Sequence, residues 1–333
     1  MSLSANASSP IPASSAPLLQ AEGVTVRFDA CERPFDVVRD VSFTLHPGRT
    51  LCLVGESGCG KSMTALSLLR LIPEPGRLAA GRILFEGRDL AELSESAMER
   101  VRGRDIGMIF QEPMTSLNPV HTIGFQIGEM LRIHYPQLSK EEVEKRVVAQ
   151  LEAVGISNAK ERIKQYPHQF SGGMRQRVMI AMAIICKPKL LIADEPTTAL
   201  DVTIQAQVLD LMHKLKQEGA LMMVTHNLGV VAELCDEIVV MYAGRVVERG
   251  TLIDIFDNPR HPYTQGLMAA IPTLSSDKGE LFTIAGTVPS ASDFPKGCRF
   301  APRCNQAKPE CMNEVPPVKA VNEKHYVQCW LEV

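Results

Sequence analysis

The chain begins with alternating apolar and polar residues and continues with short runs that are apolar throughout. Residues 24–28 and 41–45 alternate, which predicts antiparallel strands with one buried face. Residues 50–54 and 106–110 are apolar runs, which is typical of strands buried on both faces. Residues 81–87 end in glycine and predict a further strand. The first third of the chain is therefore expected to be rich in strands.

Helical periodicity dominates the middle of the chain and then alternates with strands. Apolar residues on one helical face predict helices at 123–133, 140–154 and 172–186. Helices are also expected at 61–72 and 203–218. Apolar runs predict strands at 189–193, 221–225, 238–242 and 245–248, the last of which we expect to be the final strand. Helices that alternate with strands predict a mostly parallel sheet covered on both faces.

The two ends of the chain differ from this core. Residues 1–17 are mostly Ser, Ala, Pro and Asn, which predicts a disordered tail. Proline is frequent and long apolar stripes are missing after residue 258. A segment with so few apolar residues to form a core usually needs a cross-link, such as a bound metal, to be stable.

Composition excludes two classes of protein. Lys plus Arg is 35 and Asp plus Glu is 38, a net charge of −3, which lacks the basic excess of nucleic-acid-binding domains. The most apolar stretch, 178–186, is far shorter than the ~20 residues of a membrane span. Residues 1–20 have neither the basic start nor the apolar centre of a signal peptide, so we expect a cytoplasmic protein. Nine cysteines in such a compartment are not expected to form disulfides.

A glycine-rich phosphate-binding loop is the strongest motif. Gly55-Glu-Ser-Gly-Cys-Gly-Lys61-Ser62 fits the pattern G-x-x-x-x-G-K-[ST] between a predicted strand and a predicted helix. Its backbone N–H groups and helix start attract phosphate, Lys61 supplies charge, and the Ser62 hydroxyl suits Mg²⁺. The alternative, a chance glycine-rich turn, is disfavoured by the strand and helix on either side.

Two acids end a later predicted strand, where open α/β sheets bind their ligands. Asp194 is positioned to reach Mg²⁺, and Glu195 to act as general base for an attacking water. The alternative is a surface turn with two solvated acids.

Together these motifs resemble the ATP-binding cassette of ABC transporters over about residues 18–256. The order of Gly55–Ser62, Gln111, Ser171-Gly-Gly173, Asp194-Glu195, Asp201 and His226 carries this resemblance, although Phe170 and Met174 replace the usual Leu and Gln of the signature. The resemblance implies an α/β fold: a P-loop nucleotide-binding domain with a mixed sheet core, an antiparallel β subdomain and an inserted helical subdomain. The implied organisation is a tail (1–17), the nucleotide-binding domain (18–257, with a helical insertion at about 112–170) and a cysteine-rich C-terminal extension (258–333).

The same resemblance implies a sandwich of two subunits that encloses two ATP molecules with Mg²⁺. Glu195, His226 and Gln111 are the implied catalytic residues, and Ser62, Gln111 and Asp194 the implied Mg²⁺ site. ATP is expected to contact Gly55, Glu56, Ser57, Gly58, Cys59, Gly60, Lys61, Ser62, Met63, Phe28, Ser171, Gly172, Gly173 and Asp201.

Two positions in this set have alternatives. Phe28 is either the aromatic ring that stacks on adenine or a buried strand residue, and Phe35 is a second candidate for that ring. Cys59 is either an inert variable position or, since helix N-termini lower thiol pKa, a thiol whose alkylation blocks ATP binding.

A closer resemblance is to the ATPases of dipeptide and oligopeptide importers, a group shared with nickel and glutathione uptake. It is carried by residues 113–119, 166–174, 199–207 and 259–265. It implies a heterodimer with a second, related ATPase at the cytoplasmic face of the membrane, two transmembrane permease subunits, and an extracytoplasmic solute-binding protein, with no nucleic acid. The cargo stays open between di- or oligopeptides, nickel chelates, glutathione and opines.

Four cysteines crowd into the last 36 residues. Cys298, Cys304, Cys311 and Cys329 lack the C-x2–4-C knuckle of zinc sites. The importers' extension is associated with a four-cysteine [4Fe–4S] cluster, which is the favoured ligand, with zinc or unligated thiols as alternatives. Lys296, Arg299, Arg303 and Lys308 are expected to offset the negative charge of such a site.

Two other functional classes are alternatives to the transport ATPase. A cytosolic ABC-type ATPase that acts on nucleic acid or ribosomes usually has two cassettes, long insertions or basic patches. This chain is expected to have one cassette, a short helical insertion and a near-neutral charge, which disfavours that class. A redox-gated ATPase, regulated by the cluster, is an elaboration of the transport ATPase.

Overall fold

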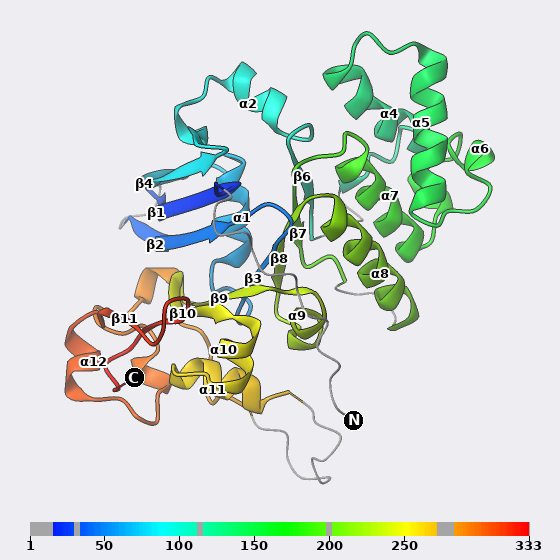
Figure 1. Ribbon diagram of the computed structural model, residues 1–333. Helices are drawn as coiled ribbons and strands as arrows, with labels where there is room; N and C mark the ends of the chain where they lie inside the picture. Colours follow the sequence, from blue (N-terminus) through cyan, green and yellow to red (C-terminus); the bar gives the residue numbers. More distant parts are fainter. Residues whose placement is uncertain (1–15, 30–33, 112–115, 198–201, 272–282, 333) are drawn as a thin grey trace.

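The structure is a computed structural model, and it describes residues 16–29, 34–111, 116–197, 202–271 and 283–332. Two sheets, a helical lobe and a C-terminal segment make up the molecule (Figure 1). Residues 1–15, most of the predicted tail, lie outside the described residues, as does Asp201. No helix in the described ranges is long and apolar enough to cross a membrane.

The smaller sheet is antiparallel, as the alternation at 24–28 and 41–45 predicts. Its strand order is β2-β1-β4-β5. The strands are β1 (Leu19–Phe28), β2 (Phe35–Leu45), β4 (Gly76–Phe85) and β5 (Arg88–Asp89). β4 is longer than the predicted 81–87 because it pairs with β1 along its whole length.

The larger sheet has eight strands in the order β11-β12-β10-β9-β3-β8-β7-β6. Its central strands, from β9 to β6, are parallel and buried, as their continuous apolar runs predict. The strands are β3 (Thr50–Val54), β6 (Ile106–Ile109), β7 (Leu190–Asp194), β8 (Ala220–Thr225), β9 (Glu237–Tyr242), β10 (Arg245–Thr251), β11 (Val318–Ala320) and β12 (Tyr326–Gln328). The carboxyl ends of β3, β6, β7 and β8 meet at one edge, which is where the sequence places its phosphate-binding and acidic motifs.

The helices cover both faces of the larger sheet. The longer ones are α1 (Lys61–Leu68), α4 (Ile123–His134), α5 (Lys140–Ala153), α7 (Gly172–Ile184), α8 (Val202–Glu218) and α11 (Pro262–Ala269). The shorter ones are α2 (Glu95–Val101), α6 (Ala159–Arg162), α9 (Leu228–Leu234), α10 (Leu252–Asp257) and α12 (Pro309–Asn313). Single 3₁₀ turns occur at Leu90–Glu92, Pro167–Gln169, Ala291–Asp293 and Ala301–Arg303.

Two buried apolar clusters hold these layers together. One fills the space between the two sheets around α1, which contacts β1 and β2 on one side and β7 and β8 on the other. The second lies on the opposite face of the larger sheet and continues into the helical lobe. Because α1 is packed between two sheets, the loop that starts it is held on a rigid scaffold.

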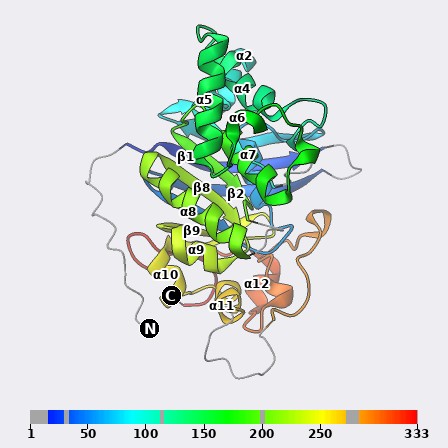
Figure 2. The same ribbon diagram turned by 90° about the vertical axis from the view of Figure 1, so that its right-hand side faces the viewer.

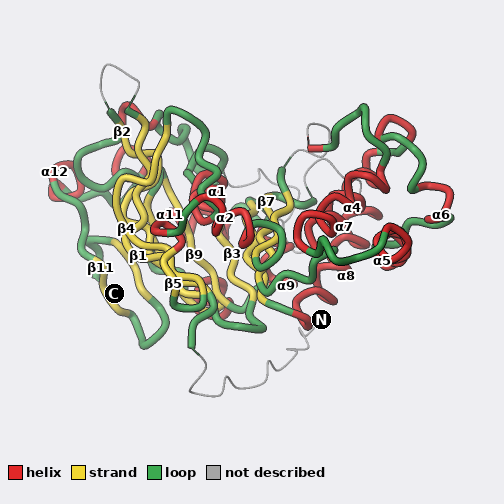
Figure 3. Tube along the Cα trace, turned by 90° about the horizontal axis from the view of Figure 1, so that it is seen from above, coloured by secondary structure: helices red, strands yellow, loops and turns green. Residues whose placement is uncertain are grey.

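The helical lobe consists of α4, α5, α6 and α7 and lies to one side of both sheets (Figure 3). The apolar faces of α4 and α5 pack against each other and against α7. Thr122 and Ser139 accept hydrogen bonds from backbone N–H groups in the first turns of α4 and α5, which marks where each helix begins. The helices predicted at 123–133 and 140–154 are thus confirmed.

The C-terminal segment extends the larger sheet, so β10 is not the final strand as expected. β12 pairs antiparallel with β10, and β11 pairs with β12. The segment lies at the end of the molecule opposite to the helical lobe (Figure 2). Its strands are only three residues long, too short for the hydrophobic pattern to indicate them.

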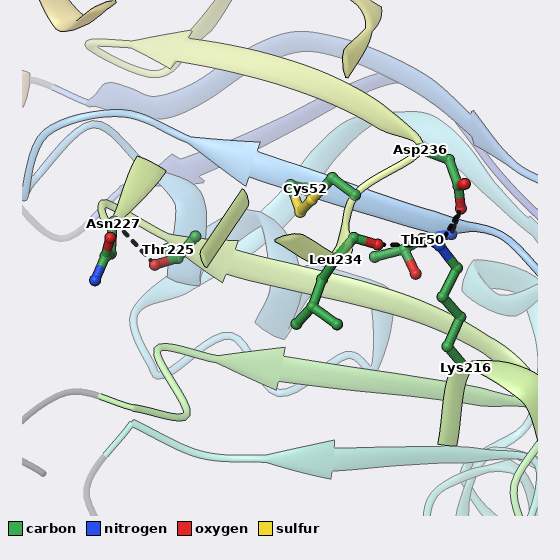
Figure 4. Close-up of a disulfide and its surroundings, with 8 residues drawn as sticks. Thr50, Cys52, Lys216, Thr225, Asn227, Leu234 and Asp236 are labelled. Atoms are coloured by element: carbon green, nitrogen blue, oxygen red, sulfur yellow. Dashed lines mark hydrogen bonds and ion pairs between the residues drawn. A yellow bond between two sulfur atoms is a disulfide. The ribbon is translucent and has the colours of Figure 1, made fainter. Parts of the chain in front are cut away.

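The structure contains a disulfide that the sequence analysis did not expect. Cys52 of β3 and Cys235, which follows α9, are bonded with their Cα atoms 6.1 Å apart (Figure 4). Beside it, Asp236 accepts a hydrogen bond from the backbone N–H of Thr50 at 2.8 Å and pairs with Lys216 at 3.0 Å. The expectation that no cysteines pair was wrong because β9, which begins just after Cys235, lies next to β3 in the sheet. Cys31 lies outside the described residues.

Candidate nucleotide-binding and hydrolysis site

The glycine-rich loop connects β3 to α1 at the carboxyl edge of the sheet. Gly55 has no room for a side chain, because a Cβ there would lie 2.3 Å from the carbonyl oxygen of Met241. Gly58 and Gly60 have positive φ values of 80° and 95°, which favour glycine, and Gly60 is the N-cap residue of α1. The backbone thus wraps tightly before the helix, the geometry that directs N–H groups at an anion.

Lys61 lies inside this loop with only 4% of its surface exposed. Its Nζ donates to the carbonyl oxygens of Gly55 at 2.8 Å and Glu56 at 3.0 Å. Within the described part of the chain no carboxylate forms an ion pair with it. It also donates to Cys59 Sγ at 3.7 Å. A buried ammonium group whose hydrogen-bond partners are two carbonyl oxygens and a sulfur is suited to receive an anion such as a phosphate.

Ser62 and Asp194 meet across the edge of the sheet. Ser62 Oγ donates to Asp194 Oδ1 at 3.0 Å, which joins the start of α1 to the end of β7. Burial raises the pKa of Asp194, and the hydrogen bond from Ser62 opposes that rise. A hydroxyl and a carboxylate are oxygen ligands of the kind Mg²⁺ prefers, so these two residues fit a magnesium site.

Glu195 is the centre of a second group of side chains. Its Oε1 lies 3.0 Å from Nδ1 of His226, which follows β8. Its Oε2 accepts a hydrogen bond from Nε2 of Gln111, which follows β6, at 3.4 Å. Glu195 has a positive φ of 47° and is 7% exposed, so its backbone is held in an unusual conformation. The strand ends thus bring together three residues that lie far apart in the sequence.

The signature residues, Ser171, Gly172 and Gly173, lie apart from the side chains around Glu195. Ser171 is the N-cap residue of α7 and accepts a hydrogen bond from the backbone N–H of Met174 at 3.4 Å. Ser171 and Gly172 are exposed, and no hydrogen bond among the described residues joins Ser171, Gly172 or Gly173 to the glycine-rich loop. Within one chain, the exposed N-terminus of α7 therefore lies on a surface apart from the glycine-rich loop.

Phe28 and Phe35 form one stacked pair at the edge of the smaller sheet. Their ring centroids are 5.9 Å apart with an interplanar angle of 9°. Both rings are partly exposed, so the arrangement keeps both as candidates for adenine stacking. Met63 lies in the first turn of α1 and is partly exposed.

Cys59 differs from the reactive thiol that its helix-start position suggests. Its side chain is fully buried, and burial raises its pKa although nearby Lys61 acts in the opposite direction. Helix-start position alone could not indicate this, because burial of the sulfur outweighs the nearby positive charge. Burial therefore favours the inert alternative for Cys59 over the reactive thiol.

The four C-terminal cysteines line a single cavity. Its other lining residues are largely apolar and include Pro262, Phe300 and Leu331. Burial raises the pKa of Cys298 to about 11 and also raises the pKa of Cys304 and Cys329. Among the described residues, however, no three His, Cys, Asp or Glu side chains are grouped closely enough to bind one metal ion.

Arg303 has a partner that the sequence analysis missed. It was expected to offset charge at the cysteines, but its guanidinium forms an ion pair with Glu56 of the glycine-rich loop at 2.6 Å. Arg299, with the same expected role, donates to the carbonyl oxygen of Ala243. Spacing along the sequence could not indicate the Arg303–Glu56 pair, because its members lie 247 positions apart in the sequence.

The fold and this site define an ATP-binding cassette, the ATPase class of ABC transporters. The family model "ABC transporter" matches residues 38–198, and "Oligopeptide/dipeptide transporter, C-terminal region" matches residues 247–311. A dimeric ATP-binding cassette solved in a post-hydrolysis state with ADP and phosphate has a TM-score of 0.63 and 26% identity, covering 70% of this chain and 98% of that chain.

Proteins of similar sequence show to which group of ABC transporters the chain belongs. A Brucella ovis protein named as a peptide import ATP-binding protein is 54% identical over 95% of this chain and 98% of its own length. The oligopeptide transport ATP-binding protein OppD of Bacillus subtilis is 52% identical over 94% of this chain and 88% of its own length. The chain belongs to the family of ATP-binding subunits of peptide-importing ABC transporters.

Proposed function

We propose that this chain binds and hydrolyses ATP to energise the import of di- or oligopeptides through an ABC transporter. The observation that carries this proposal is the convergence of Lys61, Asp194 and Glu195 at one sheet edge, in a chain 54% identical to a peptide import ATP-binding protein. The alternatives, an ATPase that does not act in transport and a redox-gated ATPase, gain no support from these relatives, which are named for transport.

The proposed chemistry assigns each side chain of the site a part in hydrolysis. Gly55–Ser62 wrap the phosphates, and Lys61 leaves its carbonyl partners to contact the β- and γ-phosphates. Ser62, Asp194 and Gln111 would hold Mg²⁺, which stabilises the developing charge when bound. Glu195 accepts a proton from the attacking water, and His226 orients that water and the γ-phosphate.

The exposed signature supports a further part of the proposal, a two-subunit sandwich. The N-terminus of α7 offers N–H groups and a positive dipole end to an anion, but lies apart from the chain's own glycine-rich loop. Ser171, Gly172 and Gly173 therefore contact the γ-phosphate held by a partner subunit. The family resemblance assigns Asp201, which lies outside the described residues, to the same interface. Phe28 or Phe35 stacks on the adenine.

The remaining assignments concern domains and partners. We assign 18–257 to the nucleotide-binding domain, about 112–170 to the inserted helical subdomain, and 258–333 to the C-terminal extension. The partners are a related ATPase and two transmembrane permease subunits at the cytoplasmic face of the membrane, supplied by an extracytoplasmic solute-binding protein. The names of the relatives support the peptide cargo.

Dimer formation in the presence of ATP tests the proposed two-subunit sandwich. We expect Ser171→Arg to prevent dimer formation with MgATP, because the larger charged side chain blocks close approach at the signature, while ATP still binds to Lys61's loop. Light scattering after size-exclusion chromatography measures the dimer, for the chain alone and mixed with its related ATPase. Ser157→Arg, an exposed serine elsewhere in the helical lobe, is the matched control. An ATP-dependent dimer that forms equally well with Ser171→Arg would contradict the sandwich.

We also propose that Cys298, Cys304, Cys311 and Cys329 hold a [4Fe–4S] cluster with a structural role. Four thiols around one apolar cavity fit a four-thiolate ligand set. A single tetrahedral zinc ion with ~2.3 Å bonds needs its sulfurs grouped much more closely than an iron–sulfur cluster does. The cluster would cross-link segments of the extension that have little apolar core of their own.

Iron and sulfide analysis of anaerobically purified protein tests the cluster. We expect about four irons and four sulfides per chain, with a brown colour that Cys304→Ser and Cys311→Ser both diminish. Cys186→Ser, a buried cysteine outside the extension, should leave the iron content unchanged. A colourless sample that contains zinc instead would overturn the proposal.

A further inference from the structure

Glu56, the second residue of the glycine-rich loop, is held at both its backbone and its side chain by residues from the last quarter of the chain. Its backbone N–H donates to the hydroxyl of Tyr263 at 2.8 Å. Its two carboxylate oxygens accept from Arg303 at 2.6 and 3.0 Å. Because Glu56 also accepts from Lys61 through its carbonyl oxygen, one residue connects the C-terminal segment to the phosphate-binding lysine.

Every N–H donor of the Arg303 guanidinium group has an acceptor, which holds the side chain in place. Besides the two bonds to Glu56, its nitrogens donate to the hydroxyl of Tyr242 at 3.3 Å and to the carbonyl oxygens of Ile284 at 3.1 Å and Ala285 at 2.8 Å. These five bonds use all five guanidinium N–H groups. The side chain is only 5% exposed, and the hydrogen bonds to Glu56 raise its pKa. The Glu56 side chain is 31% exposed, but its two bonds to a fully hydrogen-bonded guanidinium group hold the carboxylate in one geometry.

The aromatic residues behind Glu56 are equally constrained. Tyr263 is fully buried, and its ring meets that of Tyr242 edge-on at 4.7 Å between centroids. Tyr242 also packs edge-on against Phe300, at 5.1 Å, three residues before Arg303. The ring cluster therefore contacts both groups that hold Glu56, through Tyr263 itself and through the hydroxyl of Tyr242 that accepts from Arg303.

We propose that Arg303 and Tyr263 are positioning residues for ATP binding, through which the C-terminal segment sets the conformation and charge of the phosphate-binding loop. This inference rests on the proposed function, since it concerns the same nucleotide site. Arg303 neutralises a carboxylate beside the position where the triphosphate binds, which removes a source of repulsion. Arg303 and Tyr263 together also hold the carboxylate and the backbone N–H of Glu56, which keeps this part of the loop in one conformation.

A double-mutant cycle on the affinity for MgATP tests this proposal. Arg303→Met should raise the Kd by about 10- to 100-fold, since two charge-assisted hydrogen bonds to Glu56 are lost and its carboxylate is left unpaired. Adding Glu56→Gln to Arg303→Met should recover part of that loss, because it removes the unpaired charge. Tyr263→Phe should raise the Kd less, by about threefold to tenfold, since it loses one neutral hydrogen bond. Calorimetry on the full chain provides the Kd, with thermal unfolding measured in parallel.

The controls distinguish a failure of the positioning role from a failure of the proposed ATP-binding site. Lys319→Met alters a cation of the same segment whose bonds go to Trp330 and Leu331, so it should leave the Kd unchanged. If the unmodified chain bound no MgATP, the proposed function would fail. If it bound MgATP and Lys61→Ala weakened binding, but Arg303→Met, Glu56→Gln and their combination all bound like the unmodified chain, the positioning role would be overturned. A folded Arg303→Met that Glu56→Gln does not rescue at all would exclude the charge component.

Discussion

Replacing Glu195 with Gln is expected to lower kcat for ATP hydrolysis by about 10²- to 10⁴-fold while MgATP still binds, because the general base is lost and the shape of the side chain is kept. The structure supports this role through the contacts of the carboxylate. Glu195 lies between His226 at 3.0 Å and Gln111 at 3.4 Å, at the end of the strand that also carries Asp194. Phosphate release under single-turnover conditions measures the chemical step, and calorimetry measures binding.

The same substitution at a different acidic residue shows whether the loss of kcat is specific to Glu195 or follows from any loss of negative charge. Glu233 is an exposed acid of α9 that pairs only with His213 among the described residues, so Glu233→Gln should keep full turnover. The Glu195→Gln variant should also accumulate an ATP-bound dimer, because binding proceeds and hydrolysis does not. Undiminished phosphate release by a folded Glu195→Gln variant would remove Glu195 from its proposed role.

Lys61→Ala is expected to weaken MgATP binding by about 10- to 100-fold and to reduce hydrolysis at least as much, since charge-assisted hydrogen bonds to phosphate are lost. The change leaves the carbonyl oxygens of Gly55 and Glu56 without their present partner, but both belong to a loop. Its effect on folding should be smaller than its effect on binding. Titration with a fluorescent ATP analogue measures the affinity, and thermal unfolding measures stability.

An exposed lysine serves as the comparison. Lys214 lies on the surface of α8, and Lys214→Ala removes the same charge away from the site. It should bind MgATP like the unmodified chain. Equal affinity for MgATP in Lys61→Ala and Lys214→Ala would contradict the assignment of the glycine-rich loop as the phosphate site.

Much of the core could be predicted from the sequence because its signals are local. The run at Thr50–Val54 and the periodicity of α4 and α5 reflect burial that each segment shows on its own. The phosphate-binding loop was also evident, since glycine is required at Gly55 by close contact with Met241 and at Gly60 by its positive φ. The ends of parallel strands then place Asp194 and Glu195 beside it.

The rest depends on contacts between distant segments, which no local pattern records. The Cys52–Cys235 disulfide and the Arg303–Glu56 pair each join residues more than 180 positions apart. The seven-residue helix α9 was missed because it is too short to show clear periodicity. Cys59 shows the same limit for chemistry: position at a helix start suggests a lowered thiol pKa, while the surrounding core raises it.

ATP-dependent peptide uptake by a reconstituted transporter tests the central claim most directly. Proteoliposomes would contain this chain, its related ATPase and both permease subunits, with the solute-binding protein outside and MgATP available to the ATPases. We predict uptake of labelled di- or oligopeptide that requires MgATP and is nearly abolished when this chain carries Glu195→Gln, but not when it carries Glu233→Gln. Peptide uptake that continued at the full rate with Glu195→Gln would contradict the conclusion that ATP hydrolysis by this chain drives import.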